Sequence, residues 1–413
     1  MAAIKSGNAN NLLLSLSLAA AALPGVVDDA YAADPNYFDI NSQFSRYSES
    51  NKRMQVDVYQ ASAFVPISSS WDLKVNGVTD IVTGASPVLY LPGNAGKPFM
   101  VMSGASIHDV RDSVDMTVNY KHDNGSFALG LGRSTENDYI SNFFSLDNRV
   151  DLNNKNTTLE TGYSFSSDTV WAMDHCPPHC LGDTETSGQY KRPGVGGDKS
   201  THQGLLGITQ ILDKNSLMQT NLTYTFNEGY LSDPYKVVYT PWVTTPYPGY
   251  SDFGGYSHDT RPGTRHQVAL LTRYVRHFNQ LNSAAIHLDY RFFADNWGIQ
   301  AHTFEAAWIQ PLLNQWQLTP RVRYYSQNSA DFYQPYFDNP RTDGHYSSDY
   351  RLAQFGAFSG GLELSKEFFE TVKLGFGIDF YQRRQDQAIS GGIGTHVDNY
   401  SFSILSAKLN VKF

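Results

Sequence analysis

Apolar and polar residues alternate one by one along much of the chain. In "AAIHLDYRFF", Ile286, Leu288 and Tyr290 alternate with His287 and Asp289. The same period of two recurs in "LMQTNLTYTF", "WQLTPRVRYY" and "TVKLGFGIDFYQ", whereas an amphipathic helical period does not recur. Because successive side chains of a strand point to opposite faces, the pattern predicts an all-β protein whose strands have one apolar and one polar face.

The connections between the predicted strands differ in length at the two ends of the sheet. Short turns are predicted at 123–125, 153–156, 213–216, 279–283 and 313–315, and long connections at 85–111, 172–200, 233–263, 332–347 and 384–398. Short periplasmic turns and long extracellular loops are typical of bacterial outer-membrane barrels. These markers predict a transmembrane antiparallel up-and-down β-barrel of about 16 strands, with both chain ends on the short-turn side.

The chain ends on "SAKLNVKF", in which Ala407, Leu409, Val411 and Phe413 alternate with polar residues. The closing strand of a barrel must pair on both edges and carry an apolar band on one face. We therefore interpret this segment as the last strand. Its terminal aromatic resembles the recognition signal of the barrel insertion machinery, so Phe413 is the predicted assembly signal.

The first residues have the layout of a secretory signal peptide. Lys5 precedes an apolar run from Leu12 to Leu23, and cleavage is expected after Ala32 or Ala33. This run is shorter than the roughly 20 residues that a membrane-spanning helix needs. The predicted division is a cleaved signal peptide at 1–32 and an outer-membrane β-barrel domain at 33–413, in the cell outer membrane.

Composition narrows the class of protein further. Aromatic residues make up 14% and charged residues 17% of the 413 residues, and the net charge is -9. An acidic chain without a basic face is not expected to bind nucleic acid. Neither Gly-x-Ser-x-Gly nor His-Glu-x-x-His occurs, and "PGVGGDKS" is interpreted as a flexible linker rather than a phosphate loop. We therefore expect neither an enzyme nor a cofactor.

Several segments together resemble a known family. They are "SGASIHDVRDSVDMTVNY", "NTTLETGYSFSSDTV", "LTYTFNEGYLSDPYKVV", "HLDYRFFADNWGIQAHTFEAAWIQPL", "RVRYYSQNSADFY" and "YRLAQFGAFSGGLEL". Their combination is similar to an uncharacterised family of bacterial outer-membrane β-barrels, domain of unknown function 3570. The resemblance implies a fold and a location, but no activity, substrate or catalytic residue. The family's members are often encoded near thioredoxin-like and flavin-transferase proteins, which implies a link to envelope redox biology.

The two cysteines of the chain lie in "DHCPPHC". An exported Cys176–Cys180 pair is expected to form a disulfide. His175, Cys176, His179 and Cys180 also offer four ligands for zinc or copper. Free thiols are the third alternative.

Charges on the polar strand faces are the remaining candidates for function. The predicted lumen-lining charges are Arg273, His287, Asp289, Arg291, Glu305, Arg321, Arg323, Glu363, Lys373 and Asp379. In an aqueous pore such charges set ion selectivity, but opposite charges on neighbouring strands also pair and stabilise the wall.

The predicted function is a porin-like channel for small solutes. The alternative is a non-transporting barrel that acts as a surface scaffold or assembly partner for envelope redox proteins. The expected partners are outer-membrane lipid, the barrel insertion machinery and small solutes, and the sequence leaves the oligomeric state open.

Overall fold

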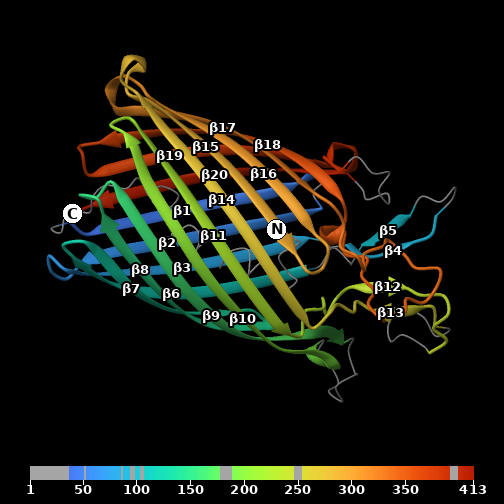
Figure 1. The fold of residues 1–413 in the computed structure, drawn as a ribbon. Coiled ribbons are helices and arrows are strands. Elements are labelled where there is room, and N and C mark those ends of the chain that lie inside the picture. Colours follow the sequence, from blue (N-terminus) through green and yellow to red (C-terminus); the bar gives the residue numbers. More distant parts are fainter. Residues whose placement is uncertain are drawn as a thin grey trace.

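The computed structural model describes residues 37–413, with gaps at 51–52, 85–86, 94–97, 103–106, 177–187, 246–253 and 391–398. Sixteen antiparallel strands close into one barrel in chain order, with β20 beside β1 (Figure 1). The strands are β1 (Asp39–Glu49), β2 (Met54–Pro66), β3 (Trp71–Gly84), β6 (Ile107–His122), β7 (Gly125–Thr135), β8 (Tyr139–Leu152), β9 (Thr157–Cys176), β10 (Gly188–Asp213), β11 (Ser216–Gly229), β14 (Thr264–Phe278), β15 (Ala284–Asp295), β16 (Gln300–Pro311), β17 (Trp316–Gln327), β18 (Phe355–Phe368), β19 (Val372–Arg384) and β20 (Tyr400–Lys412). The predicted fold is confirmed.

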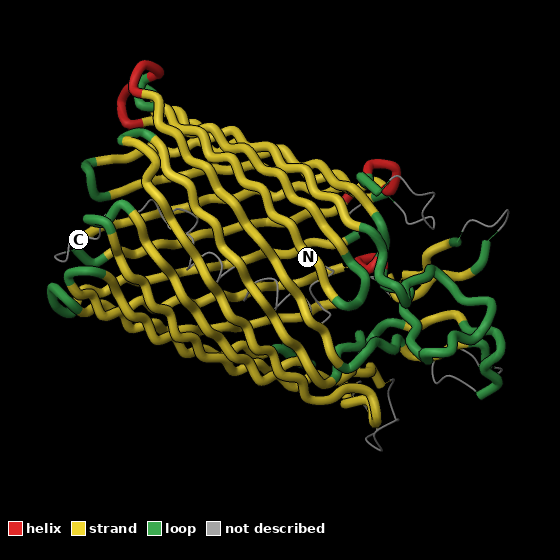
Figure 2. Tube along the Cα trace, viewed as in Figure 1, coloured by secondary structure: helices red, strands yellow, loops and turns green. Residues whose placement is uncertain are grey.

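Short turns lie at the barrel end that holds the C-terminus, and the long connections lie at the other end (Figure 2). The short-turn end includes the 3-10 turns η4 (Asn279–Leu281) and η5 (Leu313–Gln315). The long-loop end carries two small sheets, β4 (Pro87–Leu91) with β5 (Phe99–Met102) and β12 (Val237–Tyr239) with β13 (Tyr256–His258), and the turns η6 (Tyr350–Leu352) and η7 (Gln385–Gln387). Among the described residues, no helix is long and apolar enough to cross a membrane.

The long connection predicted at 172–200 is wrong over most of its length. β9 continues to Cys176 and β10 begins at Gly188, so "PGVGGDKS" belongs to a strand and is not a flexible linker. The register with β9 shifts just before Gly196, whose φ is +129°. A Cβ at Gly196 would lie 2.2 Å from the carbonyl oxygen of Val170. This glycine therefore accommodates an irregularity where two strands approach closely.

The last strand closes the barrel as its alternation predicts. Asp39 pairs with Lys412, and the backbone N–H of Phe413 donates to the carbonyl oxygen of Phe38 at 2.9 Å. The other edge of β20 pairs with β19, so both edges of the strand are satisfied. The role of Phe413 in assembly stays a prediction.

The outer face of the barrel is apolar and exposed. Leu288, Val322 and Phe376 are exposed on β15, β17 and β19, whereas their chain neighbours His287 and Arg321 line the interior. An exposed apolar band around a closed barrel is the surface that lipid covers.

A row of tyrosine–histidine pairs lies on this outer face, on β9 to β16 and towards the long-loop end of the wall. The pairs are Tyr163–His202, Tyr224–His266 and Tyr290–His302, with hydroxyl to Nδ1 distances of 2.9, 2.8 and 2.9 Å. A phenylalanine two residues after each tyrosine packs on the same imidazole, with ring centroids 4.8, 4.8 and 5.3 Å apart. Aromatic girdles of this kind form where a barrel crosses the membrane–water interface.

Three long connections pack together into what we call the loop cap, the described residues of 87–102, 230–263 and 328–354. Its apolar core includes Tyr90, Phe332 and Tyr350, which pack with Trp297 in the β15–β16 connection. Arg383 on β19 donates to the carbonyl oxygen of Tyr350 at 2.6 Å. The cap is therefore attached to the barrel wall at the long-loop end.

Candidate functional site

A polar cavity of about 1110 Å³ lies inside the barrel. Asp39, Glu370 and Lys412 line it at the short-turn rim, so the cavity reaches the end that holds the C-terminus. Seven of the predicted lumen charges line it, namely Arg273, His287, Asp289, Glu305, Arg321, Glu363 and Lys373. Strand alternation places the other three, Arg291, Arg323 and Asp379, on the same inner face.

The Arg321–Asp379 ion pair spans an intervening strand. Arg321 Nε and Nη2 donate to the Asp379 carboxylate at 2.9 and 2.5 Å. Gly361 of β18 stands in register between the two residues. A Cβ at Gly361 would lie 2.1 Å from Asp379 Oδ1 and 2.7 Å from Arg321 Nε. The missing side chain thus leaves room for a bidentate pair, the strongest arrangement of these two groups.

Other predicted lumen charges also pair along the wall. Arg273 donates to Asp289 through Nε at 2.7 Å and through Nη2 at 2.5 Å. Glu363 accepts from Lys408 at 2.8 Å. Sequence reasoning missed Lys408, although the alternation of "SAKLNVKF" places it on the inner face. For these residues the structure shows the pairing alternative.

The wall formed by β3, β6 and β8 adds charges that sequence reasoning missed. Asp80 pairs with Arg111, and Asp115 accepts from the side-chain amide of Asn76 at 2.6 Å. Asp147 also lines the cavity, and no described Lys or Arg side chain forms an ion pair with it. The inward positions of "LKVNGVTDIV" and "VRDSVDMTVNY" carry the signal that could have found the pairs.

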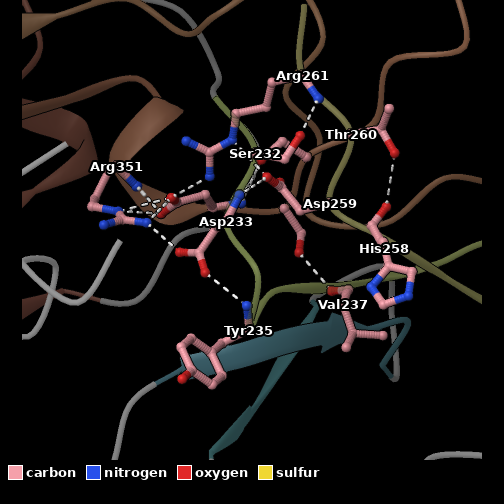
Figure 3. A network of polar contacts seen from close by, with 12 residues as sticks. Ser232, Asp233, Tyr235, Val237, His258, Asp259, Thr260, Arg261 and Arg351 are labelled. Atoms are coloured by element: carbon pink, nitrogen blue, oxygen red, sulfur yellow. Dashed lines mark hydrogen bonds and ion pairs between the residues drawn. The ribbon is translucent and has the colours of Figure 1, made fainter. Parts of the chain in front are cut away.

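Buried charges hold the loop cap together (Figure 3). Arg351 pairs with Asp349 and donates to Asp233 at 2.8 Å, while Arg261 donates to Asp259 at 2.6 Å and to Asp349 at 2.8 Å. Burial opposes ionisation of Asp349, but the Arg351 and Arg261 charges outweigh it, so the pKa of Asp349 lies well below its usual value. The network ties connection 230–263 to connection 328–354.

A group of three carboxylates lies near the loop cap. Asp109, Glu136 and Asp138 each place an oxygen within 4.8 Å of the others, and oxygen ligands suit Ca²⁺ or Mg²⁺. Asn137 donates to Asp109 at 3.0 Å, and the Tyr235 hydroxyl donates to Asp138 at 2.5 Å. Sequence reasoning missed this group because β6 and the β7–β8 connection supply it jointly.

The cysteine motif falls largely outside the described residues. Cys176 is the last residue of β9, but its side chain and that of His175 are outside the description, as are His179 and Cys180. The disulfide, the metal site and the free thiols therefore stay predictions.

Solved structures with similar folds are outer-membrane barrels of low sequence identity. A bacterial polysaccharide outer membrane secretin is 7% identical with a TM-score of 0.45, covering 91% of this chain and 98% of that one. CdiB from Acinetobacter baumannii is 9% identical with a TM-score of 0.49, covering 91% and 60%. The outer membrane protein OpdK from Pseudomonas aeruginosa is 8% identical with a TM-score of 0.41, covering 91% and 99%.

A comparison with curated protein sequences finds no match. A family model, in contrast, matches residues 13–404, which is nearly the whole chain. This is the family that the sequence segments resemble. The chain belongs to the family described as "Protein of unknown function (DUF3570)".

Proposed function

We propose that this protein lies in a bacterial outer membrane and passes small polar solutes through its barrel. The single observation that carries the proposal is the cavity, which polar and charged side chains line as far as the short-turn rim. A barrel of 16 strands is wide enough to hold an aqueous channel unless loops fill it. The exposed apolar outer face supports placement in a membrane.

The loop cap favours a second candidate function. Connections from several places around the barrel share one apolar core, and Tyr350 packs against Arg383 and Tyr400 of the wall. Loops that pack at the mouth restrict passage. A non-transporting barrel that serves as a surface scaffold or assembly partner for envelope redox proteins would use the cap itself as its working surface.

Conductance of the purified protein in planar lipid bilayers tests the proposal. We expect stepwise currents from the wild type in potassium chloride. Arg351→Ala should raise the open fraction, because it breaks the ion pairs that join two connections of the cap. Arg341→Ala is the matched control, since Arg341 pairs only with the nearby Asp343 among the described carboxylates and both are partly exposed.

Absence of current from both the wild type and Arg351→Ala, with both proteins folded on unboiled gels, would refute the channel. It would favour the scaffold. Equal currents from Arg351→Ala and Arg341→Ala would refute control by the cap.

A further inference from the structure

Two inward arginines differ from the paired charges of the wall. Arg291 on β15 is exposed, and no described carboxylate lies within 4.0 Å of it; its nearby ring is Phe293, 5.6 Å from the guanidinium carbon. Arg323 on β17 reaches Glu305 only at 4.0 Å, with 49% of its side chain exposed. Both charges thus remain accessible from the lumen without a close counter-ion.

The strand register brings these two arginines together around Tyr325. Arg291, Thr303 and Tyr325 lie side by side on β15, β16 and β17. Thr303 is small and buried, so the larger side chains around it cover it. Arg323 lies two residues before Tyr325 on the same face, and its charge acts on both Arg291 and Tyr325. Like charges repel, and an anion bound near both would offset that repulsion.

The neighbouring arginines are already engaged. Arg265 donates to Asp295 at 2.8 and 2.5 Å. Arg383 donates to Tyr350 and lies 3.9 Å over the ring of Phe355. Arg265 and Arg383 both add positive potential near Tyr325, but their guanidinium groups are already bound to these partners. Among the described arginines near Tyr325, Arg291 and Arg323 are therefore the two that remain to bind an added anion.

This part of the wall is joined to the loop cap. The Tyr325 hydroxyl donates to Gln327 Oε1 at 2.6 Å, and Gln327 Nε2 donates to the carbonyl oxygens of Arg351 and Ala353 at 2.9 and 2.7 Å. A solute at the two arginines would therefore lie between the cap and the rest of the lumen.

We propose that Arg291, Arg323 and Tyr325 form a binding site for the carboxylate group of a small organic anion. A guanidinium offers two parallel N–H donors that match the two oxygens of a carboxylate. The Tyr325 ring forms the side of the site, with its hydroxyl hydrogen directed to Gln327. Such a site would make small organic anions the solute class of the proposed channel. Its role in transport rests on that proposed function.

Isothermal titration of the whole protein in a neutral detergent tests the site, with succinate as the probe at constant ionic strength. Succinamide is the neutral ligand control, and inorganic phosphate is a second anion. We expect saturable binding of succinate that weakens by at least about tenfold in the double variant Arg291→Gln, Arg323→Gln. Arg46→Gln with Arg276→Gln removes the same charge from the outer face and should leave binding unchanged.

Arg291→Lys gives an independent test that retains the charge and so guards against misfolding. It should weaken succinate binding several-fold, because an ammonium cannot make the bidentate contact. Equal binding of succinamide, binding of phosphate without succinate, or wild-type affinity in the double variant would overturn the site. Succinate binding without bilayer current from either the wild type or Arg351→Ala would retain the site and refute the channel. Current without succinate binding would retain the channel and refute the site.

Discussion

Gly361→Ala tests whether the inner wall is built around specific ion pairs. The added methyl group would meet Asp379 Oδ1 at 2.1 Å and Arg321 Nε at 2.7 Å, so at least one partner must move. The matched control is the preceding residue, Gly360, because a Cβ there meets nothing within 4 Å and points to the outer face. Both substitutions exchange glycine for alanine in the same strand and change the backbone entropy alike.

The expected cost follows from two terms. Arg321 is 42% exposed, so loss of its ion pair should cost no more than about 1 kcal/mol. Forcing a methyl group into an occupied space costs about 1 to 3 kcal/mol. Gly361→Ala should therefore unfold with about 1 to 4 kcal/mol less stability than Gly360→Ala.

Urea unfolding of the two variants in lipid vesicles, followed by tryptophan fluorescence, measures the difference. In a background of Arg321→Ser with Asp379→Ser, the penalty of Gly361→Ala should largely disappear. Equal stability of Gly361→Ala and Gly360→Ala, or an unchanged penalty in the double-serine background, would refute the reasoning.

Three further perturbations probe the outer face, the chain end and the cap. Leu288→Arg should destabilise the barrel by about 2 to 4 kcal/mol if the residue lies near the membrane midplane, whereas Thr319→Arg in the cavity should cost less; urea unfolding in vesicles compares them. Phe413→Ser should leave secretion intact but lower the amount inserted in the outer membrane, and normal levels on fractionation would contradict an assembly role. The lowered pKa of Asp349 means that its ionised form stabilises the cap above pH 3.8 and that this contribution is lost as the pH falls further. Pepsin should therefore cut the cap as acid is added below that value, and full resistance at about pH 2 would contradict the role of this carboxylate.

The barrel could be predicted from sequence because the alternation of apolar and polar residues is visible within each strand by itself. Leu288 and His287 differ in polarity because one faces outward and the other lines the cavity, and no partner strand is needed to see this. The β9–β10 hairpin was misjudged for the opposite reason. Gly194, Gly196 and Gly197 resemble a linker in composition, whereas the position of Gly196 depends on its close approach to Val170.

The pairings of the inner wall could not be predicted, because they depend on register. Arg321 and Asp379 are 58 residues apart and meet only because Gly361 lies between them. The loop cap offered still less signal. Its connection 328–354 has no period, and the partners of Arg351 include Asp233, 118 residues away. Arg291 and Arg323 remain exposed because most of the other inward charges pair elsewhere, so their exposure could not be predicted before the pairings were known.

The β9–β10 hairpin extends beyond the two strands that flank it. β8 accompanies β9 only as far as Val170, and β11 accompanies β10 only from Lys199, so beyond these residues the two strands pair with each other alone. From Val170 to Cys176 the ribbon runs six residues, or about 20 Å at 3.3 Å per residue. The backbone of Cys176 thus lies well beyond the last residue of β9 that β8 pairs with, on a two-stranded extension that the Met173 backbone N–H joins to the Tyr235 hydroxyl of the loop cap at 3.1 Å.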